Sequence, residues 1–205
     1  MSVLDSYQVL GHVSTVTAPT TEPVYLATAK AHLRVDLTTE DSLILSLISA
    51  ARQHVEQLTG LALITQTLDW TIEDFPVNGA PLMLPRAPVA SVTSITSYNA
   101  SHVAAVLSTS AYTLLTNSVP PRVVLNDGYG WPTDLRDEAA GVVRAVYGYG
   151  TTENDVPEPI RQAILLLIGH WFLQREPTSP GVLSPIPLGI NALLAPYIVR
   201  HGVAV

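Results

Sequence analysis

The chain of 205 residues contains no cysteine and few charged residues. The absence of thiols excludes disulfides, thiolate metal sites and a cysteine nucleophile. Asp, Glu, Lys and Arg together make up 13% of the residues and hydrophobic residues 47%, whereas typical soluble domains are roughly a quarter charged. We therefore expect other copies of the chain to cover part of an apolar surface.

Basic runs and long apolar runs are also missing. The formal net charge is -7, which argues against non-specific binding of a phosphate backbone by the protein as a whole. The longest apolar run, Ala163–Ile168, is far shorter than the roughly 20 residues of a membrane span. The first residues, MSVLDSYQVLGHV, lack the basic start and apolar core of a secretory signal. We expect a protein that is neither secreted nor embedded in a membrane.

Motifs that carry chemistry are absent as well. There is no GxSxG, no GxxxxGK[ST] and no GxGxxG between a strand and a helix, and the six histidines form no HxH or HxxxH pair. Two carboxylate clusters occur, and neither has the spacing of a calcium loop, so solvated turns are the favoured interpretation; they are Asp69, Glu73, Asp74 and Asp134, Asp137, Glu138. We predict no catalytic residue, no metal site and no cofactor, and a binding or structural protein in place of an enzyme.

The first part of the chain predicts two helices behind an extended arm. Residues 1–25 lack periodicity, so we expect an arm and no folded element there. A short helix is predicted from about Thr28, its N-cap, to Leu33. A stronger helix begins at Thr38 or Thr39 and ends at Gly60. Its predicted apolar face comprises Leu43, Leu47, Ala51, Val55 and Leu58, widened by Ile44 and Ile48.

From residue 61 to residue 150 the pattern changes from helical to alternating, with turn residues between short runs. The spacing of the runs is typical of a small antiparallel sandwich or barrel. The predicted strands are Ile64–Ile72, Pro81–Leu84, Val89–Tyr98, Tyr112–Leu115, Arg122–Leu125 and Gly141–Tyr147.

A very apolar helix follows in the segment Val156–Glu176. Pro157 and Pro159 suit a first helical turn, where Glu158 also faces the positive end of the helix dipole. One face carries Ile160, Ile164, Leu167, Ile168 and Trp171, while Leu165, Leu166 and Phe172 place apolar surface on the other side. The segment is either a central core helix or a helix that packs against other subunits. We expect Ile160, Ile164 and Ile168 to face inward, and Leu166 and Phe172 to lie nearer the edge.

These elements predict an α+β fold in which a helical bundle, built from N-terminal and C-terminal helices, carries a β-rich antiparallel insert. The expected division is an arm at 1–25, bundle helices at 26–60, the insert at 61–150, and C-terminal helices with a tail at 151–205. A proline-rich loop, 177–187, leads to a terminal helix at about Asn191–Tyr197.

Three strings resemble one protein family in their order along the chain. They are LATAKAHLRVDLTTEDSLILSLISAARQHVEQLTGLALITQTLDW, VPEPIRQAILLLIGHWFLQRE and PLGINALLAPYIV, within residues 26–72 and 156–199. The pattern LxxAKxHLRVD is followed by a helix that ends in Thr59 and Gly60. In these features the chain is similar to the head-tail connector, or adaptor, proteins of long-tailed bacteriophages and gene transfer agents. The arm before Val24 is longer than in the shorter relatives.

The resemblance implies a structural protein made in the bacterial cytoplasm and located in the neck of a phage or phage-like particle. It implies a homo-oligomeric, typically dodecameric ring that binds the portal protein and a downstream neck or tail protein. DNA would pass through the lumen without sequence recognition. Candidate portal contacts are Leu188, Leu193, Leu194, Tyr197 and Ile198, and candidate subunit-packing residues are Leu166, Trp171 and Phe172.

Two alternatives remain open at the level of sequence. A carbohydrate-binding or carbohydrate-active β-sandwich is suggested by aromatic residues in the β region, although such residues more often fill a core; they are Trp70, Tyr129, Trp131, Tyr147 and Tyr149. Within the neck, a tail-completion protein one position lower is the other alternative.

Overall fold

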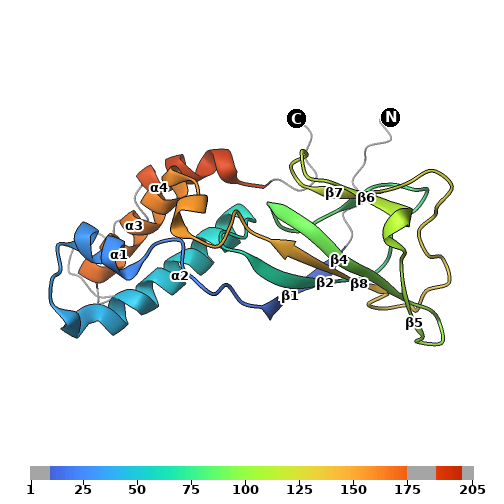
Figure 1. The fold of residues 1–205 in the computed structure, drawn as a ribbon, viewed down its shortest axis with the longest axis horizontal. Coiled ribbons are helices and arrows are strands. Elements are labelled where there is room, and N and C mark those ends of the chain that lie inside the picture. The colour runs from blue at the N-terminus through green and yellow to red at the C-terminus, as the bar shows by residue number, and fades with distance from the viewer. Residues whose placement is uncertain (1–9, 175–187, 200–205) are drawn as a thin grey trace. The chain divides into compact units, whose positions relative to one another are not determined.

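The computed structural model describes residues 10–174 and 188–199, and the side chain of Leu188 lies outside that description. Helices and antiparallel sheets occur together, so the fold is α+β as predicted (Figure 1). The chain forms two compact units. The β unit contains Thr65–Gly148, the described residues before Pro19, and Val199; the helical unit contains Pro19–Ile64 and the described residues from Tyr149 to Ile198.

The β unit holds two sheets in which every named pair of neighbouring strands is antiparallel. The larger sheet has the order β1-β2-β8-β4-β5 and the smaller one β3-β7-β6. The strands of the larger sheet are β1 (Gly11–Thr17), β2 (Gln66–Ile72), β8 (Gly141–Tyr147), β4 (Val89–Tyr98) and β5 (Ala104–Val106). Those of the smaller sheet are β3 (Leu82–Met83), β7 (Arg122–Leu125) and β6 (Tyr112–Leu115).

The core of the β unit follows from the alternation of side chains along each strand. Leu68, Trp70 and Ile72 of β2 are buried, as are alternate residues of β8, while the residues between them are partly or fully exposed. Leu82 of β3 and Val123 of β7 are fully buried in the same unit. The two sheets therefore each contribute one apolar face to this core.

Alternation predicted four of the strands with their observed bounds, namely β4, β6, β7 and β8. Two others are shorter than predicted, because β2 begins at Gln66 and β3 comprises two residues. The expectation of no folded element in the arm is wrong, since Gly11–Thr17 forms strand β1 on the edge of the larger sheet. Its sequence, GHVSTVT, is largely exposed, so backbone pairing with β2 and not an apolar pattern determines it. The three-residue strand β5 was missed for the same reason.

The helical unit consists of α1 (Leu26–Leu33), α2 (Asp41–Thr59), α3 (Glu158–Leu173) and α4 (Leu188–Leu194), with short 3₁₀ turns beside them. Helices α1, α2 and α4 all pack against α3. Ile160, Ile164 and Ile168 are fully buried, as predicted. Helix α3 is therefore a central core helix of its own unit, and Leu166 and Leu173 on it stay exposed.

Helix boundaries depend on contacts that are distant in sequence. Thr28 is not the N-cap of α1, because the helix begins at Leu26 and the backbone N–H of Tyr25 donates to Glu153 Oε2 at 2.8 Å. Helix α2 begins at Asp41 and not at Thr38 or Thr39, because Thr38–Glu40 forms a 3₁₀ turn, and Asp41 accepts a hydrogen bond from Lys30. Gly60 ends α2 in the left-handed region, at φ 74°, as predicted. Helix α4 begins at Leu188, three residues before the predicted start, and a 3₁₀ turn covers Ala195–Tyr197.

The buried face of α2 is rotated relative to the predicted one. Its centre is formed by Ile44, Ile48, Ala51 and Val55. Leu43 and Leu47 are half-buried at its flank, and Leu58 is exposed, so the inclusion of Leu58 was wrong. The flank of α2 therefore offers apolar surface to solvent.

The backbone of Gly141 in the β unit lies close to the ring of Phe75, and this contact gives a first prediction. A Cβ atom on Gly141 would lie 2.7 Å from the ring of Phe75 and 3.0 Å from the carbonyl oxygen of Thr96. We expect Gly141→Ala to lower the free energy of unfolding by about 1–3 kcal/mol, because overpacking forces the neighbours to shift. Gly130→Ala is the matched control, since nothing lies within 4 Å of a Cβ at that position, and its effect should stay within about 0.5 kcal/mol. Urea unfolding of both variants measures the difference; equal stability would contradict the packing described here.

Candidate functional site

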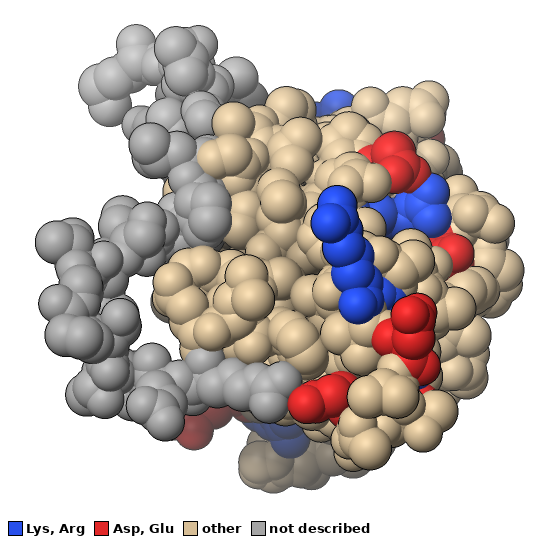
Figure 2. Space-filling view, turned by 90° about the vertical axis from the view of Figure 1, so that its left-hand side faces the viewer, with Lys and Arg blue, Asp and Glu red and all other residues tan. Residues whose placement is uncertain are grey.

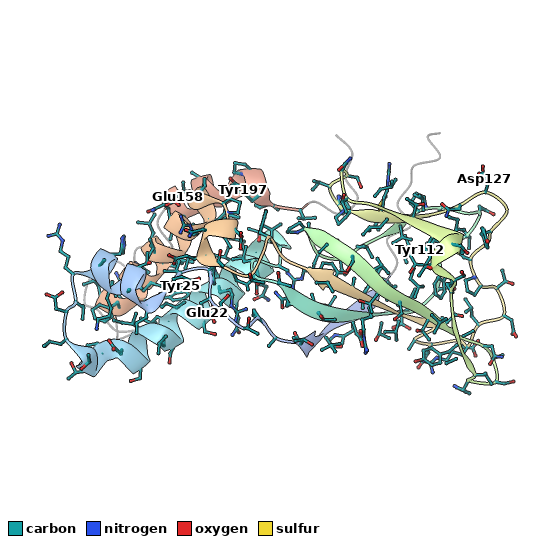
Figure 3. All side chains as sticks on the ribbon, in the orientation of Figure 1. Glu22, Tyr25, Tyr112, Asp127, Glu158 and Tyr197 are labelled. Carbon is teal, nitrogen blue, oxygen red and sulfur yellow. The ribbon has the colours of Figure 1, made fainter. Side chains whose placement is uncertain are left out.

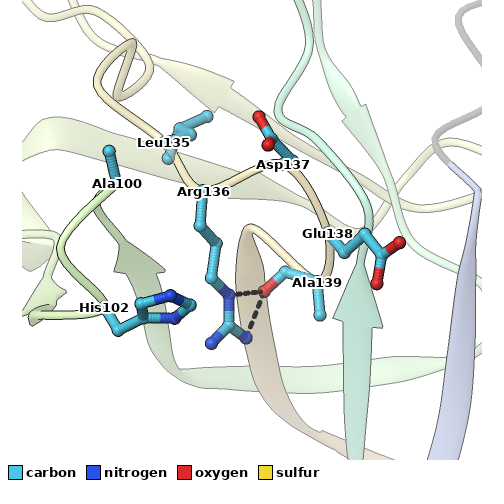
Figure 4. Close-up of a pocket in the computed structure, with 7 residues that line it drawn as sticks. All are labelled: Ala100, His102, Leu135, Arg136, Asp137, Glu138 and Ala139. Atoms are coloured by element: carbon cyan, nitrogen blue, oxygen red, sulfur yellow. Dashed lines mark hydrogen bonds between the residues drawn. The ribbon is translucent and has the colours of Figure 1, made fainter.

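A surface hollow of about 560 Å³ lies in the β unit (Figure 4). Its residues are Ala100, His102, Leu135, Arg136, Asp137, Glu138 and Ala139. Arg136 Nε and Nη2 both donate to the carbonyl oxygen of Ala139, at 2.9 and 2.6 Å, and its guanidinium lies 4.2 Å from the centre of the Tyr98 ring. The arginine therefore holds a loop in place. Among the described residues, no three His, Asp or Glu side chains gather as metal ligands.

The aromatic residues of the carbohydrate alternative do not form a common platform. Trp70, Trp131 and Tyr147 are 4%, 7% and 1% exposed. Trp131 Nε1 donates to the carbonyl oxygen of Ala80 at 2.9 Å, and burial raises the pKa of Tyr147. These three rings fill the core of the β unit. Tyr129 is exposed, and the three buried rings do not join it in a surface on which a sugar could stack.

In the helical unit, the residues of the LxxAKxHLRVD motif build a fixed corner between α1 and α2. Lys30 Nζ donates to Asp41 Oδ1 at 2.6 Å and to the carbonyl oxygen of Leu37 at 3.1 Å. Arg34 ends α1 in the left-handed region, at φ 57°. Leu37 is 71% exposed at this corner. The lysine of the motif therefore orders a loop that presents a leucine to solvent.

A second network anchors the segment before α1 to α2. Arg52 Nε donates to Glu22 Oε2 at 2.7 Å, and Arg52 Nη1 donates to Glu56 Oε2 at 2.9 Å. Glu56 Oε1 accepts the backbone N–H of Leu63 at 2.9 Å. Burial alone would lower the pKa of Arg52, but the hydrogen bond to Glu22 and the two negative charges offset it, so the pKa is raised. Glu22 and Tyr25, both labelled in Figure 3, lie on this segment.

The C-terminal end of α3 carries the three candidate subunit-packing residues. Trp171 is half-buried and meets His54 of α2 edge-on, with ring centres 6.0 Å apart. Phe172 is also half-buried, and Leu166 is 39% exposed. Leu173, which the sequence analysis did not select, is 82% exposed. Its place seven residues, or two helical turns, after Leu166 was the available signal for it.

The candidate portal contacts divide by accessibility. Leu194 is fully buried within the chain, Leu193 and Tyr197 are half-buried, and Ile198 is exposed. Leu188 begins α4, and its side chain lies outside the described part. Burial, and secondarily Tyr197, raises the pKa of Tyr149. Tyr197, labelled in Figure 3, is the last residue of the C-terminal 3₁₀ turn.

Charged residues are sparse on the face of the helical unit seen in Figure 2. A few Lys, Arg, Asp and Glu side chains stand between wide areas without charge. None of the helices that the structure describes is both long and apolar enough to cross a bilayer. Exposed apolar side chains on the described helices include Leu45 and Leu58 of α2 and Leu173 of α3.

Part of the chain matches a known protein family. Residues 23–113 match the family model described as "Phage gp6-like head-tail connector protein". The predicted resemblance to head-tail connectors is confirmed. The matched stretch contains α1, α2 and the strands from β2 to β5. No curated protein matches the chain.

Solved structures of similar fold come from gene transfer agent (GTA) particles. A chain of "Neck of empty GTA particle computed with C6 symmetry" is 25% identical, with a TM-score of 0.76, over 92% of this chain and 96% of that one. A chain of "Neck of native GTA particle computed with C12 symmetry" is 23% identical, with a TM-score of 0.75, over 92% and 96%. A chain of "Virion of native gene transfer agent (GTA) particle" is 24% identical, with a TM-score of 0.75, over 92% and 95%. The fold shared with these chains of GTA particles therefore covers nearly the whole chain, beyond the stretch that the family model matches.

The two arginine pairs yield a second prediction. Arg52 is 11% exposed and binds two carboxylates, whereas Arg144 is 45% exposed and binds Asp69. We expect Arg52→Ala to lower the free energy of unfolding by roughly 2–4 kcal/mol, because two partly buried carboxylates lose their cation. Arg144→Ala should leave the free energy of unfolding nearly unchanged, since solvent screens an exposed pair. Thermal and urea unfolding compare the two variants, and an equal loss would show that the buried network does not anchor the segment.

Proposed function

We propose that this protein is a structural head-tail connector in the neck of a phage or a gene transfer agent, and that it is not an enzyme. The observation that carries the proposal is the extent of the likeness, which covers 92% of this chain and 96% of a chain in a GTA neck. The connector family model matches the same chain independently. The protein would therefore reside in the virion.

The quaternary structure proposed is a ring, typically of twelve copies, between the portal and the tail components. Related necks computed with C6 and C12 symmetry support a cyclic assembly. A cyclic ring needs two different surfaces on each subunit, which meet head to tail. The helical unit is proposed to act as one bundle, with the β unit as an insert that projects its own surfaces.

The C-terminal end of α3 is proposed as one packing surface between subunits. Leu166 and Leu173 are exposed there beside the half-buried Trp171 and Phe172. An apolar cluster of this kind is unfavourable in water and stabilising when a neighbour covers it. The low charge fraction of the whole chain fits such coverage.

The portal is proposed to bind at the end of α4 and the 3₁₀ turn. Ile198 is exposed, and Tyr197 and Leu193 are partly accessible. Leu194, which is fully buried, would support this surface from within the chain. Leu188, the first residue of α4, completes the proposed set.

DNA is proposed to pass through the ring without being read. The net charge of -7 per copy supports this role, because each cationic contact with a phosphate releases counterions and strengthens binding. A lumen that bound many phosphates would retain the genome.

Assembly with the portal is the direct test. We expect the full chain, mixed with the portal protein of the same particle, to give a complex whose mass corresponds to a closed ring on the portal. Ile198→Asp should weaken portal binding at least tenfold, because a charge would be buried in an apolar contact. Mass photometry counts the complexes. A portal mixture without any ring, at every concentration and ionic strength tried, would contradict the proposed function.

The packing surface on α3 can be tested separately from the portal surface. We expect Leu166→Asp to reduce the fraction of rings at least tenfold, about 1.4 kcal/mol per contact, while the unfolding midpoint of the monomer changes little because the side chain is exposed. Gln57→Asp is the matched control, since it adds the same charge at an exposed position of α2. Native mass spectrometry reports the ring fraction, and equal ring formation by both variants would place the subunit contact elsewhere.

A further inference from the structure

The larger sheet of the β unit has two open edges, strand β1 on one side and strand β5 on the other. Backbone groups alternate in direction along a strand. The carbonyl oxygen of Leu10 accepts from the N–H of Glu73 at 3.0 Å, next to β2. By alternation, His12 and Ser14 also bond to β2, and the N–H and C=O groups of Gly11, Val13 and Thr15 point away from the sheet.

The opposite edge follows by the same reasoning. Val103 accepts a backbone hydrogen bond from Asn99 at 3.1 Å, and Leu107 donates one to Ile95 at 2.8 Å. Val103, Ala105 and Leu107 therefore face β4, while Ala104 and Val106 point their backbone groups outward. No backbone group among the described residues pairs with these outward groups on either edge.

Both edge strands lack charged residues and proline. Edge strands are commonly protected by charged residues or proline. Between Asp5 and Glu22, and again between Arg86 and Arg122, the sequence contains no Asp, Glu, Lys or Arg. The one irregularity of β1 is a register shift between Thr15 and Thr17, which leaves Gly11–Thr15 regular. At the other edge, Val103 and Val106 are 60% and 67% exposed.

Charge and symmetry indicate that another copy of the same chain binds at these edges. Copies that each carry a net charge of -7 repel one another, so two uncharged edges are the parts that approach at the lowest electrostatic cost. The two edges differ from each other, which is the requirement for a head-to-tail contact that closes into a ring. A contact of β1 with β1 would instead close as a pair of copies.

We infer that β1 of one copy pairs with β5 of the next, so that the larger sheets join edge to edge around the ring. The inference rests on the proposed ring and names the backbone contact within it. Successive antiparallel pairs from β1 to β5 leave these two strands running in the same direction. Rotation about a ring axis preserves that direction, so the new pair is parallel. Its hydrogen bonds join the outward groups of Gly11, Val13 and Thr15 to those of Ala104 and Val106.

Cysteine cross-linking tests the pairing, because the chain has no native cysteine. Ser14 and Ala104 are exposed and lie on the same face of the sheet, as the strand register requires. Full chains with Ser14→Cys and with Ala104→Cys are mixed, assembled with the portal and treated with a short bis-maleimide. We expect covalent dimers in the mixture and in neither variant alone, and a ladder up to the closed ring for the double variant. Thr116→Cys, in the loop after β6, replaces Ala104→Cys in the control mixture.

A backbone variant gives an independent readout. Val13→Pro removes an outward N–H that β2 does not use, and Val13→Ala truncates the same side chain but keeps that N–H. We expect Val13→Pro to reduce the ring fraction at least tenfold relative to Val13→Ala, with similar unfolding midpoints for both.

The outcomes separate the inference from the function on which it rests. Rings without a cross-link in the mixture would overturn the β1–β5 pairing and leave the connector function standing. Cross-linked dimers of Ser14→Cys alone would overturn it in favour of a β1–β1 pair. Absence of rings with the portal would refute the proposed function, and the pairing with it.

Discussion

The burial of α3 is the interaction on which the helical unit depends. Three helices pack on it, two that precede the β unit in sequence and one that follows it. Ile160, Ile164, Leu167 and Ile168 are fully buried, and each such side chain contributes roughly 1.5–3 kcal/mol relative to exposure. The helices on either side of Thr65–Gly148 in sequence therefore share one apolar helix that no single neighbour could cover.

Polar contacts add direction to this apolar packing. Glu153 accepts the N–H of Tyr25, and Arg52 joins Glu22 to Glu56. Both networks tie the segment before α1 to parts of the same unit that lie further along the sequence. Apolar burial does not define orientation by itself, whereas hydrogen bonds to charged groups do. The corner at Lys30 and Asp41 has the same effect on the turn between α1 and α2.

The sequence predicted those elements in which a pattern of apolar side chains indicates burial. It missed the strands that are defined by backbone hydrogen bonds alone. Alternating apolar residues located β4, β6, β7 and β8, and glycine located the end of α2. Strand β1 is built from small and β-branched residues that stay exposed, so no periodicity marks it. For the candidate site, Leu166 and Leu194 were both selected because they are apolar. Leu166 is exposed and Leu194 is fully buried. The sequence does not distinguish them, because tertiary contacts decide which side of a helix is buried.

The cap of α1 by Glu153 bears on the order in which the chain can fold during synthesis. The two partners are 128 residues apart, and the Thr65–Gly148 segment of the β unit lies between them. Contacts of such high sequence separation form late, since the intervening loop must first be closed. On the ribosome, α1 and α2 emerge long before α3 exists to cover them. The Thr65–Gly148 segment is thus synthesised before α3 (Glu158–Leu173), and the helical unit closes only after α3 has been made.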